Sequence, residues 1–94
     1  MQDCSIVDEL YEVVSGRREN PVDGSYTNYL FAKGREKICK KLGEEAVEVI
    51  LAAAASKRED TVEEIADLTY HILVLMADMG ITPGDVDTAL RARR

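Results

Sequence analysis

The sequence has few of the residues that build sheets or disulfide frameworks. Among 94 residues there is no Trp and one Phe, whereas Ala, Leu, Val and Glu are abundant, a composition that favours helices over strands. The two cysteines, Cys4 and Cys39, are too few for a disulfide framework. We therefore expect both to be free thiols in a reducing cytoplasm, with Cys39 packed rather than reactive.

Positive charge is also scarce, because the formal net charge is −6. This balance argues against a nucleic acid or an anionic membrane as the main partner. The first residues carry Asp and Glu where a signal peptide would be apolar, and the run VILAAAA is too short to span a membrane. We expect a cytoplasmic protein, although bridging metal ions would still allow a phosphorylated ligand.

The spacing of apolar residues and the Gly and Pro positions predict five helices in one domain, residues 1–94. No segment alternates with a period of two, so the expected fold is an all-α bundle. Thr61 with Glu64 predicts a capping box that starts the fourth helix, and Thr82 before Pro83 predicts the start of the last. The expected helices cover residues 5–15, 26–33, 35–56, 60–79 and 83–92.

Acidic residues border the apolar stripes of the third and fourth helices. In the third helix Glu45 lies within the stripe, and Glu44 and Glu48 lie along one flank. In the fourth helix Glu64 lies at the stripe's edge and Asp67 on its flank. The SKRED turn makes these helices antiparallel neighbours, so the two acidic flanks can face one cleft.

Close carboxylates repel one another, and Mg²⁺ compensates such repulsion well because it takes oxygen ligands and substrate phosphates. The pattern therefore predicts a Mg²⁺ site. The alternative is a solvated charged face in which Lys41 pairs with a neighbouring Glu. Lys37 and Lys41 share the acidic flank, where they can bind phosphate oxygens. For His71 the alternatives are contact with substrate or a metal-bound water, and a position behind the ligands or on the surface. The predicted metal ligands are Glu45, Glu48, Glu64 and Asp67.

The fourth helix is apolar nearly all round, and five helices can hardly surround it and the third helix completely. We expect a homodimer that buries the back faces of both helices. The stripe expected in the chain's own core is Ile65, Leu68, Ile72, Leu75, Met76 and Met79. The back faces expected against the second copy are Ala66, Tyr70, Leu73, Val74 and Ala77, with Val47, Leu51 and Ala54 of the third helix.

The segments SYTNYLFAKGREKICKKLGEEAVEVILAA and EEIADLTYHILVLM resemble the phosphoribosyl-ATP pyrophosphatase family, within the all-α NTP pyrophosphatases of MazG-like type. The resemblance covers nearly the whole chain. It implies an all-α dimer that uses Mg²⁺ to hydrolyse phosphoribosyl-ATP to phosphoribosyl-AMP and pyrophosphate, the second step of histidine biosynthesis. It also implies a protein without a fused cyclohydrolase domain, since 94 residues leave no room for one.

The family's E-E-x-x-E and E-x-x-D signature falls on the predicted metal ligands, with Glu44 as accessory ligand or water-orienting base. The resemblance further implies that substrate is contacted by Ser25, Tyr26, Thr27, Lys37 and Lys41. Two alternatives stay open. One is a house-cleaning NTP pyrophosphatase acting on free nucleotides, and the other is a non-catalytic helical dimerisation module.

Overall fold

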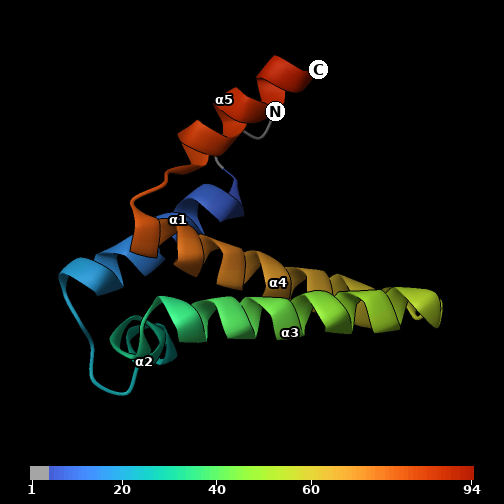
Figure 1. The fold of residues 1–94 in the computed structure, drawn as a ribbon, viewed down its shortest axis with the longest axis horizontal. Helices are drawn as coiled ribbons and strands as arrows, with labels where there is room; N and C mark the ends of the chain where they lie inside the picture. The colour runs from blue at the N-terminus through green and yellow to red at the C-terminus, as the bar shows by residue number, and fades with distance from the viewer. Residues whose placement is uncertain (1–4) are drawn as a thin grey trace.

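The computed structural model describes residues 5–94, and within this range the chain forms five helices and no strands (Figure 1). The expected all-α fold is thus confirmed. Cys39 is a free thiol, but it is exposed, so the expectation that it packs is wrong. Cys4 lies outside the described residues. The helices are α1 (Ile6–Glu19), α2 (Tyr26–Lys33), α3 (Arg35–Ala54), α4 (Arg58–Met79) and α5 (Pro83–Arg93).

Helices α3 and α4 form a long antiparallel pair that dominates the molecule (Figure 1). A tight turn joins them, in which Ser56 adopts a left-handed conformation with φ of 57°. The amide of Lys57 donates to the carbonyl of Ala52, which closes the turn at 3.1 Å. Helix α1 packs on α4, and α2 contacts α1, α3 and α4. The acidic flanks therefore run side by side along the α3–α4 pair.

The core lies where α1, α2, α3 and α4 meet. It is built from aliphatic side chains, and burial of each Val, Leu or Ile side chain stabilises the fold by about 1.5–3 kcal/mol. Tyr11, Phe31 and Tyr70 pack against its edge and bring most of the chain's few aromatic rings to it. The buried core consists of Val14, Leu30, Ile38, Val74 and Ala77.

Side-chain caps set several helix boundaries. The Ser25 hydroxyl accepts a hydrogen bond from the Asn28 amide at the start of α2, and Thr82 and Asp85 form a capping box that starts α5. The predicted capping box of Thr61 and Glu64 is wrong. Helix α4 already begins at Arg58, and the Thr61 hydroxyl donates to the backbone carbonyl of Lys57, the N-cap residue. Helix α1 is also longer than expected and ends at Glu19.

The assignment of faces on α4 is reversed for most of the predicted residues, although Met76 is buried as expected. Leu73, Val74 and Ala77, expected against a second copy, are buried in the chain's own core. Ile65 and Ile72, expected in that core, are exposed. The reason is that α1 and α2 pack on the side taken for the back. On α3 the structure is compatible with the predicted back face, because Val47, Leu51 and Ala54 are exposed in the single chain.

Helix α5 extends away from the other helices and contains no buried residue (Figure 1). It is bent by 108° relative to α4. Among the described helices, none is by itself long and apolar enough to cross a membrane, and α4 with α5 meets that test only as this bent pair.

Candidate active site

Three carboxylates from the two long helices converge on one point. Glu45 of α3 and Glu64 and Asp67 of α4 each offer an oxygen, and these oxygens lie within 4.8 Å of one another. Glu45 and Glu64 are half-buried, whereas Asp67 is exposed. Hard oxygen donors of this kind are what Mg²⁺ prefers, and an exposed edge leaves room for water and substrate phosphates. The donor set thus fits a Mg²⁺ ion.

The electrostatics of Glu64 show that the group is crowded with negative charge. Burial is the main cause that raises the pKa of Glu64, and the nearby charges of Glu48, Asp67 and Glu45 raise this pKa further. Glu48 therefore acts on the cluster electrostatically, although it is not one of the three converging residues. A divalent cation would relieve this repulsion.

Glu44 is turned toward Lys41 rather than toward the cluster. The Lys41 ammonium lies 3.1 Å from a Glu44 carboxylate oxygen, one turn along α3. The hydrogen bond from Lys41 lowers the pKa of Glu44, and the same contact raises the pKa of Lys41. The structure thus favours the pairing alternative for these two residues, and both lie at the solvent-facing edge of the site.

His71 occupies a buried position behind Tyr26. Its Nδ1 lies 2.8 Å from the Asp67 backbone carbonyl, which can only accept, so Nδ1 carries the proton. In the neutral ring, Nε2 then accepts from the Tyr26 hydroxyl at 3.1 Å. His71 is only 6% exposed, whereas Tyr26 is 45% exposed. This arrangement gives His71 a supporting position; direct contact with substrate stays a prediction.

The other predicted substrate contacts divide into two groups. Lys37 places its ammonium 6.0 Å from the centre of the Tyr29 ring, on the same side of α3 as Lys41. Ser25 caps α2. Thr27 is 7% exposed, and its hydroxyl is hydrogen-bonded to that of Tyr70. Lys37, Lys41 and Tyr26 therefore line the surface beside the carboxylates, while Ser25 and Thr27 hold α2 in place.

Sequence reasoning missed Tyr29 and Lys33. Tyr29 is 44% exposed, its ring stacks on that of Tyr26, and the Lys33 ammonium lies 5.8 Å from its centre. The sequence did contain a signal for these two residues, because Tyr29 follows Tyr26 by three residues and precedes Lys33 by four. That spacing places all three on one face of α2.

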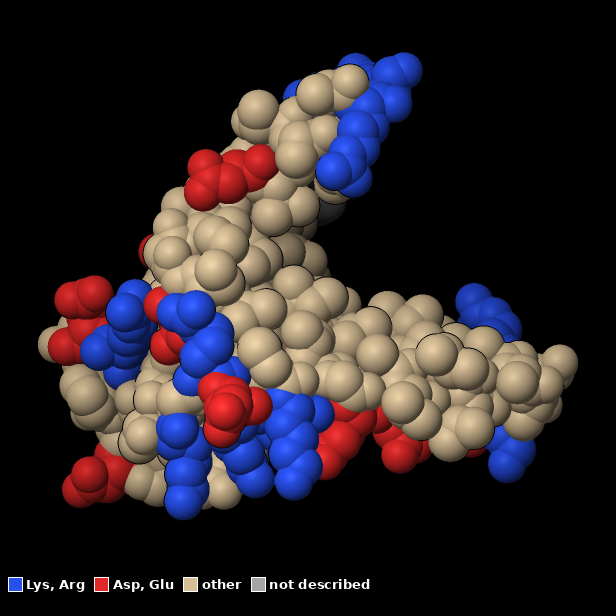
Figure 2. All heavy atoms as spheres, in the orientation of Figure 1, with Lys and Arg blue, Asp and Glu red and all other residues tan. Residues whose placement is uncertain are grey.

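Charge is segregated on the surface. Figure 2 shows basic side chains gathered over α2 and the first half of α3, and acidic side chains beside them along the edge of α3. Lys33, Lys37 and Lys41 belong to these helix segments. A phosphorylated ligand lying across the boundary would meet positive charge at one end and the carboxylates at the other.

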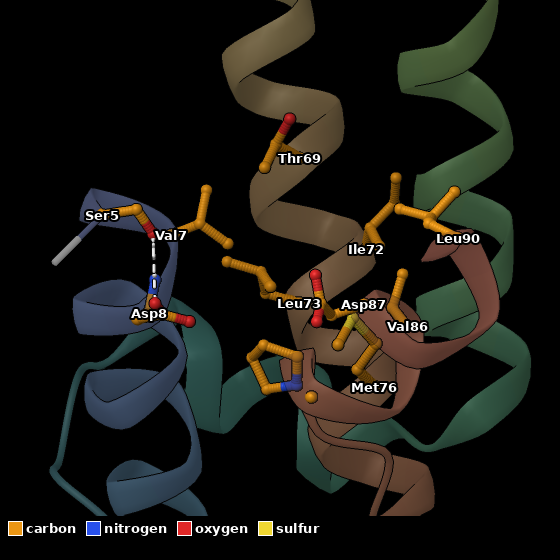
Figure 3. A pocket seen from close by; sticks show the side chains of 12 residues that line it. Ser5, Val7, Asp8, Thr69, Ile72, Leu73, Met76, Val86, Asp87 and Leu90 are labelled. Atoms are coloured by element: carbon orange, nitrogen blue, oxygen red, sulfur yellow. Dashed lines mark hydrogen bonds between the residues drawn. The ribbon is translucent and has the colours of Figure 1, made fainter. Parts of the chain in front are cut away.

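A mostly aliphatic hollow lies elsewhere. It has a volume of about 530 Å³ and lies between the start of α1, the middle of α4 and α5 (Figure 3). Its walls are mostly aliphatic, from residues such as Val7, Ile72 and Leu90, and none of the converging carboxylates lines it. We therefore assign it no catalytic role.

The whole chain is similar to known pyrophosphatases. The model of the phosphoribosyl-ATP pyrophosphohydrolase family matches residues 7–94. The phosphoribosyl-ATP pyrophosphatase of Pelotomaculum thermopropionicum is 51% identical over all of this chain and 96% of its own length. That of Listeria monocytogenes is 50% identical over 94% of this chain and 84% of its own length.

A longer relative matches as well. The histidine biosynthesis bifunctional protein HisIE of Pyrococcus furiosus is 53% identical over 96% of this chain, which corresponds to 42% of that protein. These matches confirm the resemblance predicted from the motifs around the carboxylates. The chain belongs to the phosphoribosyl-ATP pyrophosphohydrolase family.

Proposed function

We propose that this protein hydrolyses phosphoribosyl-ATP to phosphoribosyl-AMP and pyrophosphate, the second step of histidine biosynthesis. The observation that carries the proposal is the convergence of Glu45, Glu64 and Asp67 within 4.8 Å, in a chain of this family. The names of the relatives in Pelotomaculum and Listeria support the substrate. The free thiol of Cys39 is consistent with work in a reducing cytoplasm.

Mg²⁺ is the metal that suits the carboxylates, and Glu45, Glu64 and Asp67 would hold it, with Glu48 next to them. When bound, such an ion neutralises phosphate charge and lowers the pKa of a coordinated water. Burial is the main cause that raises the pKa of Glu64, and the added repulsion from Glu48, Asp67 and Glu45 is the part that a bound cation would relieve.

The chain's own residues bind the substrate and move the proton. Lys41 and Lys37 bind phosphate oxygens, and the half-exposed side chain of Tyr26 lies beside them. Hydrolysis breaks the bond between a phosphorus and the oxygen that bridges the α and β phosphates. The water oxygen bonds to that phosphorus, a carboxylate of the cluster or Glu44 accepts the water's proton, and the electron pair leaves with the bridging oxygen.

Replacement of single carboxylates tests this proposal. We expect Asp67→Asn and Glu48→Gln each to lower Mg²⁺-dependent pyrophosphate release from phosphoribosyl-ATP by at least about 100-fold. Glu63→Gln, which removes an equal charge from an exposed position on α4, is the matched control and should retain activity. Activity that survives both changes, or that needs no divalent ion, would contradict the proposed metal site.

A substrate panel tests the choice of substrate. The unmodified protein should hydrolyse phosphoribosyl-ATP in preference to each of the common deoxynucleoside triphosphates, as judged by kcat/KM with Mg²⁺. A preference for a deoxynucleotide would instead indicate a house-cleaning NTP pyrophosphatase. Absence of pyrophosphate release from every one of these compounds would indicate a non-catalytic helical module.

We further propose that two copies associate through the outer apolar side of the α3–α4 pair. Large apolar side chains are exposed on both helices, and leaving such a surface in water is unusual for a monomer. The chain also exposes 6597 Å², against about 5,400 Å² for a compact monomer of this mass. The exposed residues that support this interface are Val47, Ile50, Leu51, Val62, Ile65 and Ile72.

A further inference from the structure

Two tyrosines form an exposed aromatic surface on α2. The ring centres of Tyr26 and Tyr29 lie 6.1 Å apart, and the ring planes differ by 23°. Nearly half of each side chain is exposed. Burial of an aromatic ring is among the largest contributions a side chain makes to folding, and this chain has only five aromatic residues. Although Tyr26 also contacts the rings of Tyr70 and His71, the two tyrosines together leave an aromatic surface that a ligand can cover.

Two lysines place their ammonium groups over the Tyr29 ring. The ammonium groups of Lys33 and Lys37 lie 5.8 Å and 6.0 Å from the centre of the Tyr29 ring. This grouping stands out in a chain whose net charge is −6, and it belongs to the basic region of Figure 2. Aromatic faces suit a planar base, and lysines suit phosphate oxygens. The combination is the chemistry of a nucleotide site.

The aromatic surface is continuous with the carboxylate cluster. The Tyr26 hydroxyl is hydrogen-bonded to His71, which in turn binds the backbone of Asp67. Tyr29 lies one turn of α2 farther along. A nucleotide whose triphosphate reaches the carboxylates and Lys41 would therefore extend its base over Tyr26 and Tyr29.

A hollow beside Tyr29 provides the space for a base. It has a volume of about 520 Å³ and is formed by residues 21–26, Asn28 and Tyr29, a size within the usual range for small-molecule sites. The Asn28 amide group donates to the Arg17 carbonyl, and its oxygen accepts from the Val22 amide. These bonds hold the loop before α2 in place, so the wall of the hollow is preformed.

We propose that Tyr29, with Tyr26 beside it, is the platform on which the purine base of the nucleotide substrate stacks. The assignment rests on the proposed function, because it takes the nucleotide to be the one cleaved at the carboxylates. It adds a residue that determines specificity, since the metal and the lysines recognise phosphate and cannot distinguish one nucleotide from another.

Kinetics of Tyr29→Leu, with Tyr29→Phe as matched control, test the platform. Stacking on one ring contributes about 5- to 150-fold in affinity. Tyr29→Leu should raise KM for phosphoribosyl-ATP by about 10-fold and change kcat less than about twofold, whereas Tyr29→Phe keeps KM within about twofold. Inhibition by tripolyphosphate, which has no base, should be equal in all three proteins. An unchanged KM, or equal weakening of tripolyphosphate, would overturn the proposal.

Direct binding separates a failure of the platform from a failure of the proposed function. Adenosine 5′-monophosphate is titrated with the protein, and the line widths of its two base protons are followed by NMR. Broadening in the unmodified protein and in Tyr29→Phe, and none in Tyr29→Leu, supports the platform even if no pyrophosphate is released. Equal broadening in all three, or none in any, counts against it. Circular dichroism confirms that each variant is folded.

Discussion

At the scale of single residues, Glu64 lies where its own negative charge is unfavourable. Burial and the charges of Glu48, Asp67 and Glu45 raise its pKa. A carboxyl group whose pKa is higher in the folded than in the unfolded chain binds protons more readily when folded. Stability therefore falls as the pH rises through the window between the two pKa values. The charged form of Glu64 therefore destabilises the folded chain, and residues with such perturbed pKa values are often found at functional sites.

Glu64→Gln should therefore stabilise the metal-free protein more at pH 7 than at pH 4, because pH 4 lies below the ordinary pKa of a Glu side chain and the charge there is reduced in both the folded and the unfolded chain. Urea denaturation with a chelator present measures this as a higher midpoint at pH 7. Glu63→Gln, on the exposed side of α4, should leave the midpoint nearly unchanged. With Mg²⁺ added, the order should reverse, because only the unmodified cluster gains from the ion. A variant that is less stable than the unmodified protein at pH 7 without metal would contradict the cause given for the pKa shift.

At the scale of helices, α2 is attached to α4 by hydrogen bonds between side chains. The Thr27 hydroxyl binds that of Tyr70, and the Tyr26 hydroxyl binds His71. These bonds connect residues more than forty positions apart in the sequence. They place the aromatic surface of α2 next to the carboxylates of α4, so the geometry of the site depends on how α2 is docked.

The pair of Thr27 and Tyr70 can be tested by a double-mutant cycle. Thr27→Val and Tyr70→Phe should each lower the free energy of unfolding by about 1–2 kcal/mol, because each leaves one polar group without its partner. The double variant should lose less than the sum of the two, by about 1 kcal/mol. Urea denaturation provides the values. Strict additivity would show that the two hydroxyls are not coupled. A Thr27→Val variant that changes KM and leaves the free energy of unfolding unchanged would indicate that Thr27 serves the substrate instead.

At the scale of the whole molecule, the isolated chain is more extended than a compact domain. Its radius of gyration is 14.3 Å, against about 12 Å for a compact chain of 94 residues. Helix α5 projects from the body (Figure 1), and the aliphatic hollow of Figure 3 lies open beside it. This hollow includes Ile72, so it is continuous with the exposed apolar side of α4.

Ile65→Glu should dissociate the proposed dimer while leaving the single chain folded, because Ile65 is exposed in the chain itself. Sedimentation at micromolar concentration should give the mass of two chains for the unmodified protein and of one chain for the variant. Val13→Glu, on the exposed side of α1, is the matched control and should remain dimeric. A stable monomer in the unmodified protein would rule out the dimer.

The periodicity of the sequence determined much of what is local. Helix α2 begins and ends where expected, and the spacing placed Glu45 within the apolar stripe of one helix and Glu64 and Asp67 at the border of the stripe of its neighbour. Such features depend on 3.6 residues per turn and on caps a few residues away, and both can be read from neighbouring letters.

Only the tertiary structure decided which face of α4 is buried and which polar groups pair. A helix that is apolar on all sides gives no directional signal, so Leu73 and Ile72 could not be assigned to core or surface from spacing alone. The burial of His71 behind Tyr26 likewise depends on α2, which is distant in sequence. Long-range packing makes these choices, because they are set by which helices come to lie against α4.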